Sequence, residues 1–330
     1  TVSDFDKIEQ KRGISLNTSL LPIEWNDYKI NILDTPGYFD FIGEVEQAIS
    51  VADAAIIVIS GKDGLQVGAE KAWDICEKYN LPRMIFVTDM DIDTASYRDV
   101  IDKLTEKYGK RIAPFNLPIR ENEKLVGYVN VIQEKGFRYE GKEAVPCDVP
   151  DYNVEYMNQY RDTLMEAVAE TSEEFMDRYF SGDTFSEAEI RAAVRNNILD
   201  GSIVPVEMGS GIECKGVYTL LDDIVKYLPS AESRKMNGIN LKTNEIFEAD
   251  FDFAKPKTAF IFKTIVDPYI GRYSLIKVRS GVLKTDDLVY NSRTTEEAKI
   301  GKIYTMMGNK ATEVPELHAG DLGALAKFGN

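Results

Sequence analysis

Two apolar runs separated by a helical pattern constrain the fold of this 330-residue chain more than any other feature. Residues 54–60 (AAIIVIS) and 83–88 (RMIFVT) are continuous apolar segments of the kind that parallel sheets bury on both faces. Residues 65–79 between them have helical spacing, and so do residues 96–108 after the second run. Strands and helices that alternate over short connections predict a doubly wound α/β unit.

The same pattern continues on both sides of these elements. A strand is expected at residues 28–33 and a helix at 44–51, before the first run. Residues 112 to about 150 carry short β-like pieces that indicate an insertion, and the insertion continues as a helical pattern at 153–179. Further elements close the α/β unit near residue 230: a helix at 190–199 that begins with a capping box of Ser186 and Glu189, a strand at 204–209, and a helix at 217–228.

The C-terminal part differs from the rest in pattern and charge. Residues 231–255 are polar and without periodicity, which predicts a linker. Residues 256–330 hold short β-rich runs broken by Gly, Pro and Asn, typical of a small antiparallel β-barrel. This segment has a net charge of +3, whereas residues 1–255 have −19. The expected strands lie at 259–266, 273–280, 287–291, 298–306 and 323–328.

Composition narrows the class of protein. The chain is 44% hydrophobic and 28% charged, as soluble globular proteins are. Its longest apolar runs are too short to cross a bilayer, and no secretory pattern opens the chain, so we expect a cytoplasmic protein without membrane contact. The net charge of −16 argues against avid binding of nucleic acid by the whole chain. Three well-separated cysteines indicate neither a disulfide framework nor a metal cluster.

Three polar loops follow the expected strands, at the edge of the sheet where α/β proteins bind ligands. In the first, Asp34-Thr35-Pro36-Gly37, the carboxylate can hold Mg²⁺ through water, and Gly37 lets its N–H approach a terminal phosphate. A plain turn is an equally good interpretation of this loop alone.

The other two loops suit a purine base. Asp91 in Thr88-Asp89-Met90-Asp91 can accept both the ring and the exocyclic N–H of guanine, or it can simply cap the next turn. Small residues in Gly209-Ser210-Gly211-Ile212 allow backbone amides to meet a base carbonyl. Each loop is weak evidence alone, but their order at successive strand ends is much stronger.

Nearly the whole chain resembles the GTPase domain and second domain of elongation factor G and its close paralogues, because the same motifs occur in the same order along the chain. The resemblance rests on five motifs besides the base loops: Arg12–Ser15 (RGIS), Asp34–Asp40 (DTPGYFD), residues 259–290, Asp267–Arg272 (DPYIGR) and His318–Gly323 (HAGDLG). It implies a P-loop GTPase-type doubly wound sheet with an inserted α+β subdomain at about 112–200, then a linker and β-barrel domain II.

The resemblance also implies a function. It implies a monomeric GTPase that uses GTP/GDP and Mg²⁺ and promotes translocation on the ribosome, contacting rRNA and ribosomal proteins directly and the tRNA–mRNA complex indirectly. Ser15 and Asp34 would bind Mg²⁺, Asp34 through water. Asp34 and the other loop residues would bind GTP: Thr35, Pro36, Gly37, Thr88, Asp89, Asp91, Ser210, Gly211 and Ile212.

Departures from the family pattern qualify this expectation. The phosphate loop GxxxxGK[ST] does not occur in the chain, so we expect a GTPase domain that lacks its first strand, over residues 1–230. Tyr38 stands where the family has a His that faces the attacking water. It either orders that water as a catalytic residue or is a packing aromatic. Thr88 and Asp89 stand where the family has Asn and Lys, so we expect a weaker affinity for guanine.

Two alternatives remain open besides a canonical translocase. One is a degenerate ribosome-binding paralogue with weak nucleotide use. The other is a ribosomal protection protein of the tetracycline-resistance type. Tyr38 and the second domain favour the elongation-factor branch over the latter. His318, the only histidine, is expected to be structural, since it has no visible partner triad.

Overall fold

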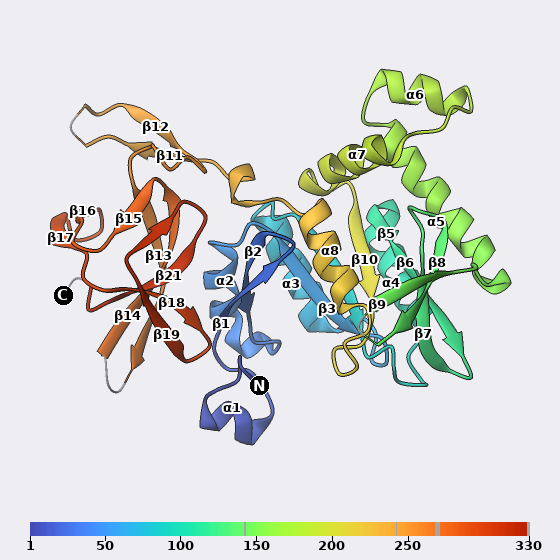
Figure 1. Ribbon diagram of the computed structural model, residues 1–330, viewed down its shortest axis with the longest axis horizontal. Helices are drawn as coiled ribbons and strands as arrows, with labels where there is room; N and C mark the ends of the chain where they lie inside the picture. The colour runs from blue at the N-terminus through green and yellow to red at the C-terminus, as the bar shows by residue number, and fades with distance from the viewer. Residues whose placement is uncertain (142, 242, 268–270, 329–330) are drawn as a thin grey trace. The chain divides into compact units, whose positions relative to one another are not determined.

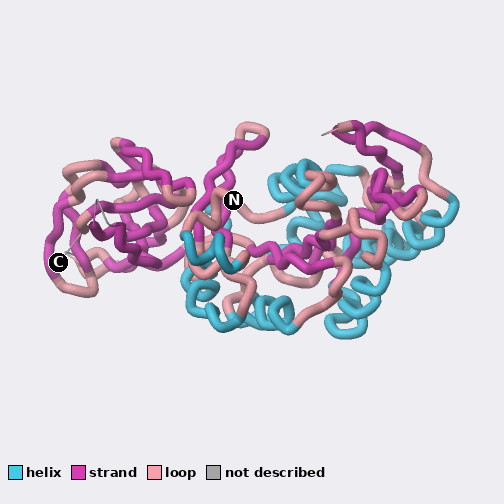
Figure 2. Tube along the Cα trace, turned by 90° about the horizontal axis from the view of Figure 1, so that it is seen from below, coloured by secondary structure: helices cyan, strands magenta, loops and turns pink. Residues whose placement is uncertain are grey.

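The computed structural model describes residues 1–141, 143–241, 243–267 and 271–328 and contains two compact units. Residues 1–53 pack with 230–330 in the first unit, and residues 54–229 form the second. Strands dominate the C-terminal region, whereas helices line the parallel sheet (Figure 2). Within the described residues, no helix combines the length and apolarity that a membrane span requires.

The second unit is built on a parallel four-stranded sheet with strand order β3-β4-β10-β5. Its helices and strands alternate along the chain, so the predicted α/β fold class is confirmed (Figure 1). The elements are β3 (Ala55–Ser60), α3 (Val67–Lys78), β4 (Arg83–Thr88), α4 (Tyr97–Tyr108), β5 (Ile112–Pro114), β10 (Val204–Met208) and α8 (Val217–Tyr227).

Strand β3 differs from the prediction in its burial. It pairs with β4 on one side and is the edge strand of the described sheet. Ile57 and Ile59 are buried, but Ile56 is partly exposed and Val58 is 59% exposed. The expectation that residues 54–60 are buried on both faces is therefore wrong, because Ile56 and Val58 share the face that the described residues leave partly open, and continuous apolarity does not reveal which face is covered.

The inserted subdomain combines an antiparallel sheet with helices. The sheet has the order β6-β7-β8-β9, so each strand pairs with its chain neighbours. Helix 153–179 was predicted as one element, but the structure has two helices, because the Ser172 hydroxyl accepts from Phe175 N at 3.1 Å and starts a second helix. The elements are β6 (Asn116–Glu121), β7 (Lys124–Asn130), β8 (Lys135–Glu140), β9 (Glu143–Cys147), α5 (Asp151–Ala169), α6 (Glu173–Phe180) and α7 (Glu187–Leu199).

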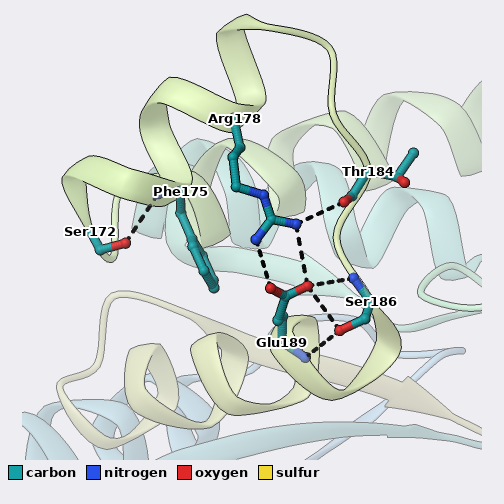
Figure 3. Close-up of polar contacts among 6 residues, drawn as sticks. All are labelled: Ser172, Phe175, Arg178, Thr184, Ser186 and Glu189. Atoms are coloured by element: carbon teal, nitrogen blue, oxygen red, sulfur yellow. Dashed lines mark hydrogen bonds and ion pairs between the residues drawn. The ribbon is translucent and has the colours of Figure 1, made fainter.

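The predicted capping box at Ser186 and Glu189 is confirmed at the start of α7. Figure 3 shows that Arg178 of α6 reaches the same carboxylate: its Nη1 donates to Glu189 Oε1 at 2.6 Å, and its Nη2 to Thr184 O at 2.9 Å. The Arg178 hydrogen bond and those from Ser186 lower the pKa of Glu189 to about 2. One carboxylate therefore both caps α7 and ties it to α6.

In the first unit, the N-terminal segment packs on the C-terminal β-domain. Leu20 and Val51 share a buried apolar cluster with Tyr273 and Leu275 of that domain. A separate cluster that includes Ile276 and Leu325 lies within the β-domain alone. The N-terminal elements are α1 (Lys7–Arg12), β1 (Ser19–Trp25), β2 (Tyr28–Asp34), the 3₁₀ turn η1 (Phe39–Phe41) and α2 (Ile42–Ile49).

Residues 231–255, which were predicted to be a linker, contain regular secondary structure that was not predicted. They form a short 3₁₀ turn, η3 (Ala231–Ser233), and an antiparallel hairpin of β11 (Met236–Ile239) and β12 (Ile246–Ala249). Strands of four residues are too short to leave a clear period-2 signal in a polar sequence.

The C-terminal β-domain is antiparallel, as predicted. Its main sheet has the order β13-β14-β21-β18-β19, and β15-β20 and β16-β17 form two further pairs. The strand expected at 298–306 is two strands, since the chain leaves the first pairing before Gly301. Residues 268–270 of the Asp267–Arg272 motif lie outside the described residues. The strands are β13 (Thr258–Asp267), β14 (Gly271–Ser280), β15 (Val282–Lys284), β16 (Leu288–Asn291), β17 (Glu296–Lys299), β18 (Ile303–Met307), β19 (Lys310–Val314), β20 (Glu316–His318) and β21 (Leu322–Ala326).

Candidate functional site

Backbone hydrogen bonds join three loops at the carboxyl edge of the parallel sheet. Gly61 N, after β3, donates to Thr88 O at 2.8 Å, and Gly209 N, after β10, donates to Val87 O at 2.9 Å. Met90 N donates to Gly209 O at 3.0 Å. The structure therefore brings together the two loops that were predicted to bind a base, which are separated by more than a hundred residues of sequence.

The loop after β4 turns sharply around Asp89. Asp89 has a φ of 61°, in the left-handed region that Asp tolerates better than most residues. Met90 is fully buried beneath the loop, whereas Asp89 and Asp91 are partly exposed. This alternation leaves both carboxylates accessible to a ligand while Met90 anchors the backbone.

The loop after β10 depends on two glycines. A Cβ on Gly209 would lie 2.2 Å from Lys215 O, and Gly216 has a φ of 77°. Ser210 is buried, and its Oγ accepts from Glu213 N at 3.1 Å. Gly211 is exposed, and Ile212 is 87% exposed, so the tip of the loop faces solvent.

Sequence reasoning missed two cations that hold these loops. Arg120 of β6 donates to Met90 O at 2.7 Å and to Ala95 O at 3.3 Å. Lys215 Nζ donates to Leu125 O of β7 at 2.8 Å and pairs with Glu213 at 2.7 Å. Both contacts involve the inserted subdomain, which no local motif links to the loops.

A buried acid pair lies just before the second base loop. Glu207 of β10 and Asp223 of α8 are both almost fully buried, and Asn116 Nδ2 donates to Glu207 Oε2. Burial and the neighbouring Asp223 carboxylate raise the pKa of Glu207 well above its usual value. This shift favours the protonated form of Glu207, and the neighbouring Asp223 also contacts Lys226 at 3.4 Å.

The first predicted loop and Ser15 belong to the first compact unit. Asp34 ends β2, and burial raises the pKa of its carboxyl group, with smaller contributions from Asp4 and Glu9. Ser15 Oγ donates to Asp4 Oδ1 at 2.7 Å, so Ser15 and Asp34 share Asp4 as a neighbour. The space around Gly37 is open, since a Cβ there would meet no atom within 4 Å.

These oxygen donors fit Mg²⁺, which prefers hydroxyl and carboxylate oxygens and retains several waters. A partly desolvated carboxylate such as Asp34 also gains from a nearby cation, because the ion would favour its charged form. Among the described residues, no group of three or more His, Cys, Asp or Glu is placed to hold a metal ion.

Tyr38 follows directly and starts the η1 turn. Its carbonyl oxygen accepts from Phe41 N at 3.1 Å, and its side chain is 55% exposed. Thr35 and Pro36 connect Asp34 to this turn. Tyr38 is not a member of the apolar clusters described above.

Helix α2, which follows this loop, ends at a group of cations. Lys277 Nζ donates to Val51 O at 2.9 Å and to both Asp53 oxygens at 2.6 Å, and Arg279 Nη2 donates to Ser50 O at 3.0 Å. Arg234 Nη1 donates to Ala52 O. Cations at a helix C-terminus donate hydrogen bonds to the free carbonyl groups and interact favourably with the negative end of the helix dipole. The end of α2 is thus fixed to β14.

Comparisons with known proteins agree with this arrangement. Residues 1–230 match the family described as Elongation factor Tu GTP binding domain, which places them in the class of GTP-binding domains. Residues 256–330 match Elongation factor G domain 2. A crystal structure of a Thermus thermophilus protein is similar, with 30% identity and a TM-score of 0.85, over 99% of this chain and 46% of that one. The chain belongs to the elongation factor G family of translational GTPases, and it spans about half the length of that structural relative.

Proposed function

We propose that the protein acts on the ribosome as an elongation factor G-like GTPase that hydrolyses GTP to GDP and promotes movement of tRNA and mRNA. The observation that carries the proposal is the match of one chain to a translation-factor GTP-binding domain and, after it, to elongation factor G domain 2. The joined base loops support it, because they lie at the sheet edge where α/β folds bind nucleotides.

The residues of the second unit would recognise the base. Asp91 would accept the ring and exocyclic N–H groups of guanine, a pairing of a carboxylate with two donors. The amides of Gly211 and Ile212, both exposed, would meet the base carbonyl, and Ser210 would bind through its place in the same loop, since its own amide donates to Lys215 O at 2.9 Å. Thr88 and Asp89 would contact the base weakly, since neither supplies a long apolar stem.

The residues of the first unit would serve the phosphates. Ser15 and Asp34 would hold Mg²⁺, Asp34 through water, and the bound ion would neutralise phosphate charge. Thr35, Pro36 and Gly37 would form the loop that presents the Gly37 N–H to the terminal phosphate. Tyr38, which is 55% exposed, would order the attacking water through its hydroxyl group.

The 330-residue chain alone should bind GTP and GDP poorly, because its sequence contains no phosphate loop of the GxxxxGK[ST] type. Calorimetric titration should give a dissociation constant above about 1 μM, weaker than roughly −8 kcal/mol. A tighter value would mean that the phosphate site has been assigned incorrectly.

Translocation is tested with the complete gene product and ribosomes that carry tRNA in the pre-translocation state. We expect mRNA to advance by one codon with GTP, and not with ATP. Asp89 favours one other candidate, a ribosome-binding paralogue with weak nucleotide use, which would bind ribosomes equally with or without GTP. Release of tetracycline without mRNA movement would instead identify a ribosomal protection protein.

A further inference from the structure

Arg120 connects the inserted subdomain to the loop that carries Asp91. Its Nη2 lies 2.7 Å from Met90 O and 3.3 Å from Ala95 O, with Ile92 O more distant at 3.5 Å. Its Nη1 donates to Glu123 O at 2.5 Å, in the turn between β6 and β7. One guanidinium group therefore joins both ends of the loop to the first hairpin of the inserted subdomain.

The charge of Arg120 suits this loop. Asp89, Asp91 and Asp93 stand at alternate positions and give the loop three carboxylates. Asp93, Glu123 and Asp91 each raise the pKa of Arg120, against a larger lowering by burial. Arg120 remains charged, since guanidinium groups are not deprotonated in proteins, and so places a positive charge near Asp91 and Asp93.

The backbone of Arg120 is itself fixed. Tyr152 at the start of α5 accepts from Arg120 N at 3.1 Å and donates to Arg120 O at 3.2 Å. Asn153 Nδ2 donates to Pro118 O at 3.1 Å on the same strand. The guanidinium therefore projects from a strand that α5 holds in place.

The same hairpin also holds the second base loop. Lys215 Nζ donates to Leu125 O in β7 at 2.8 Å. The two loops are in turn joined to each other through Met90 N and Gly209 O. Hairpin β6–β7 thus contacts both segments that would surround a base, with Arg120 holding the loop that carries Asp91.

We propose that Arg120 is a positioning residue that fixes the Met90–Ala95 backbone, and thereby aims Asp91 so that the site discriminates guanine by its 2-amino group. The identity of the ligand rests on the proposed function, whereas the fixing of the loop by Arg120 does not. Arg120 has no role in the family resemblance, and its effect passes through the backbone carbonyls it binds.

Hydrogen exchange of the 330-residue chain tests the first half of this proposal. The amides of Ile92, Ala95 and Ser96 donate within and beside the loop and should be protected. In Arg120→Met they should exchange at least about tenfold faster, and Arg120→Lys should restore part of the protection. The matched control is Arg138→Met, which removes an exposed arginine from the same sheet and its ion pair with Glu121. Unchanged exchange in Arg120→Met, or an equal rise in the control, overturns the proposal.

Nucleotide selectivity of the complete gene product tests the second half. GDP and inosine diphosphate differ only in the 2-amino group, so their affinity ratio reports whether Asp91 is correctly aimed. The ratio should fall at least about fivefold in Arg120→Met and stay constant in Arg138→Met. A constant ratio in both variants overturns the role in discrimination. If the wild-type protein binds neither nucleotide, the proposed function fails, while hydrogen exchange still decides whether Arg120 fixes the loop.

Discussion

Replacing Lys277 with Met should destabilise the first compact unit. Lys277 is 3% exposed and directs its ammonium group at Val51 O and the Asp53 carboxylate, where helix α2 ends. Burial lowers the pKa of Lys277, with Asp53 opposing the shift, so the ammonium group depends on its partners to remain charged in the fold. Met has nearly the same length and fills the space with an uncharged thioether.

The expected loss follows from the groups that remain. Val51 is fully buried, and its unpaired carbonyl oxygen would cost about 1–3 kcal/mol. Asp53 is 23% exposed and keeps part of its hydration, so it should add less than the 3–5 kcal/mol typical of breaking a fully buried pair. Removing the buried ammonium also recovers its desolvation cost. We therefore expect a net loss of about 2–4 kcal/mol.

Tryptophan fluorescence can isolate the unit concerned. The chain has two tryptophans, Trp25 in the first unit and Trp73 in the second. In a Trp73→Phe background, urea unfolding followed through Trp25 reports on the first unit alone. Lys299→Met is the matched control, since Lys299 and its partner Asp286 are 65% and 74% exposed. Its loss should stay within about 0.5 kcal/mol.

A double variant separates the ion pair from the packing. Asp53→Asn with Lys277→Met removes both charges, so it should lose less than the two single variants add up to. An unfolding free energy for Lys277→Met within about 0.5 kcal/mol of the parent would refute the reasoning. Additive losses in the double variant would show that Lys277 acts through packing and not through Asp53.

Four further predictions follow from the site and its surroundings. Tyr38→Phe in the complete gene product should lower ribosome-stimulated GTP turnover about tenfold, which is a barrier increase of roughly 1.4 kcal/mol, and leave GTP affinity unchanged. If turnover is lost in Tyr38→Ala but kept in Tyr38→Phe, Tyr38 acts through packing. Asp89→Lys should tighten GDP binding, because it removes a carboxylate beside Asp91, and calorimetry showing equal or weaker binding would contradict this. Glu207 has a raised pKa, so its folded form holds a proton that the unfolded chain releases, and stability of the second unit should fall as pH rises above 4.5. Glu207→Gln should flatten this decline in urea unfolding followed through Trp73, whereas a parallel curve would rule the pair out as its cause. Glu189 has a pKa lowered from 4.5 to about 2, so its contribution is present above pH 4.5 and lost as pH falls through 2. Hydrogen exchange at the start of α7 should therefore rise between pH 4.5 and 2 less steeply in Glu189→Gln than in the parent, after correction for intrinsic rates.

The sequence predicted elements well where a period extends over several turns or a whole buried strand. Strand Arg83–Thr88 is correct at both ends, and α4 begins one residue after its predicted start. The capping box at Ser186 is also correct, because its hydrogen bonds are local to four residues. These features depend on short-range geometry that the sequence contains in full.

The errors have a common physical origin in tertiary context. Residues 54–60 are as apolar as a central strand, yet Val58 is exposed because burial depends on what packs on each face of the sheet. The helical period of the sequence continues through residues 170–172. The helix is nevertheless interrupted there, because the Ser172 side chain caps the start of a new helix, α6. Hairpin β11–β12 was missed because two short strands gain their stability by pairing with each other.

The base loops show how much of a binding site a local motif can predict. Thr88 and Asp89 differ from the family pattern, and reading the loop from those two positions alone predicts a weakened site. Its backbone, however, is held by Arg120, about thirty residues away, and by Gly209, more than a hundred residues away. Shape and chemistry of the loop are therefore determined by different parts of the sequence. Asp89→Lys changes the chemistry and leaves the Arg120 contacts intact, whereas Arg120→Met changes the shape and leaves every base-facing side chain in place. If the first variant alters affinity and the second alters discrimination, the two determinants are independent, and the departures at Thr88 and Asp89 weaken binding without loosening the loop.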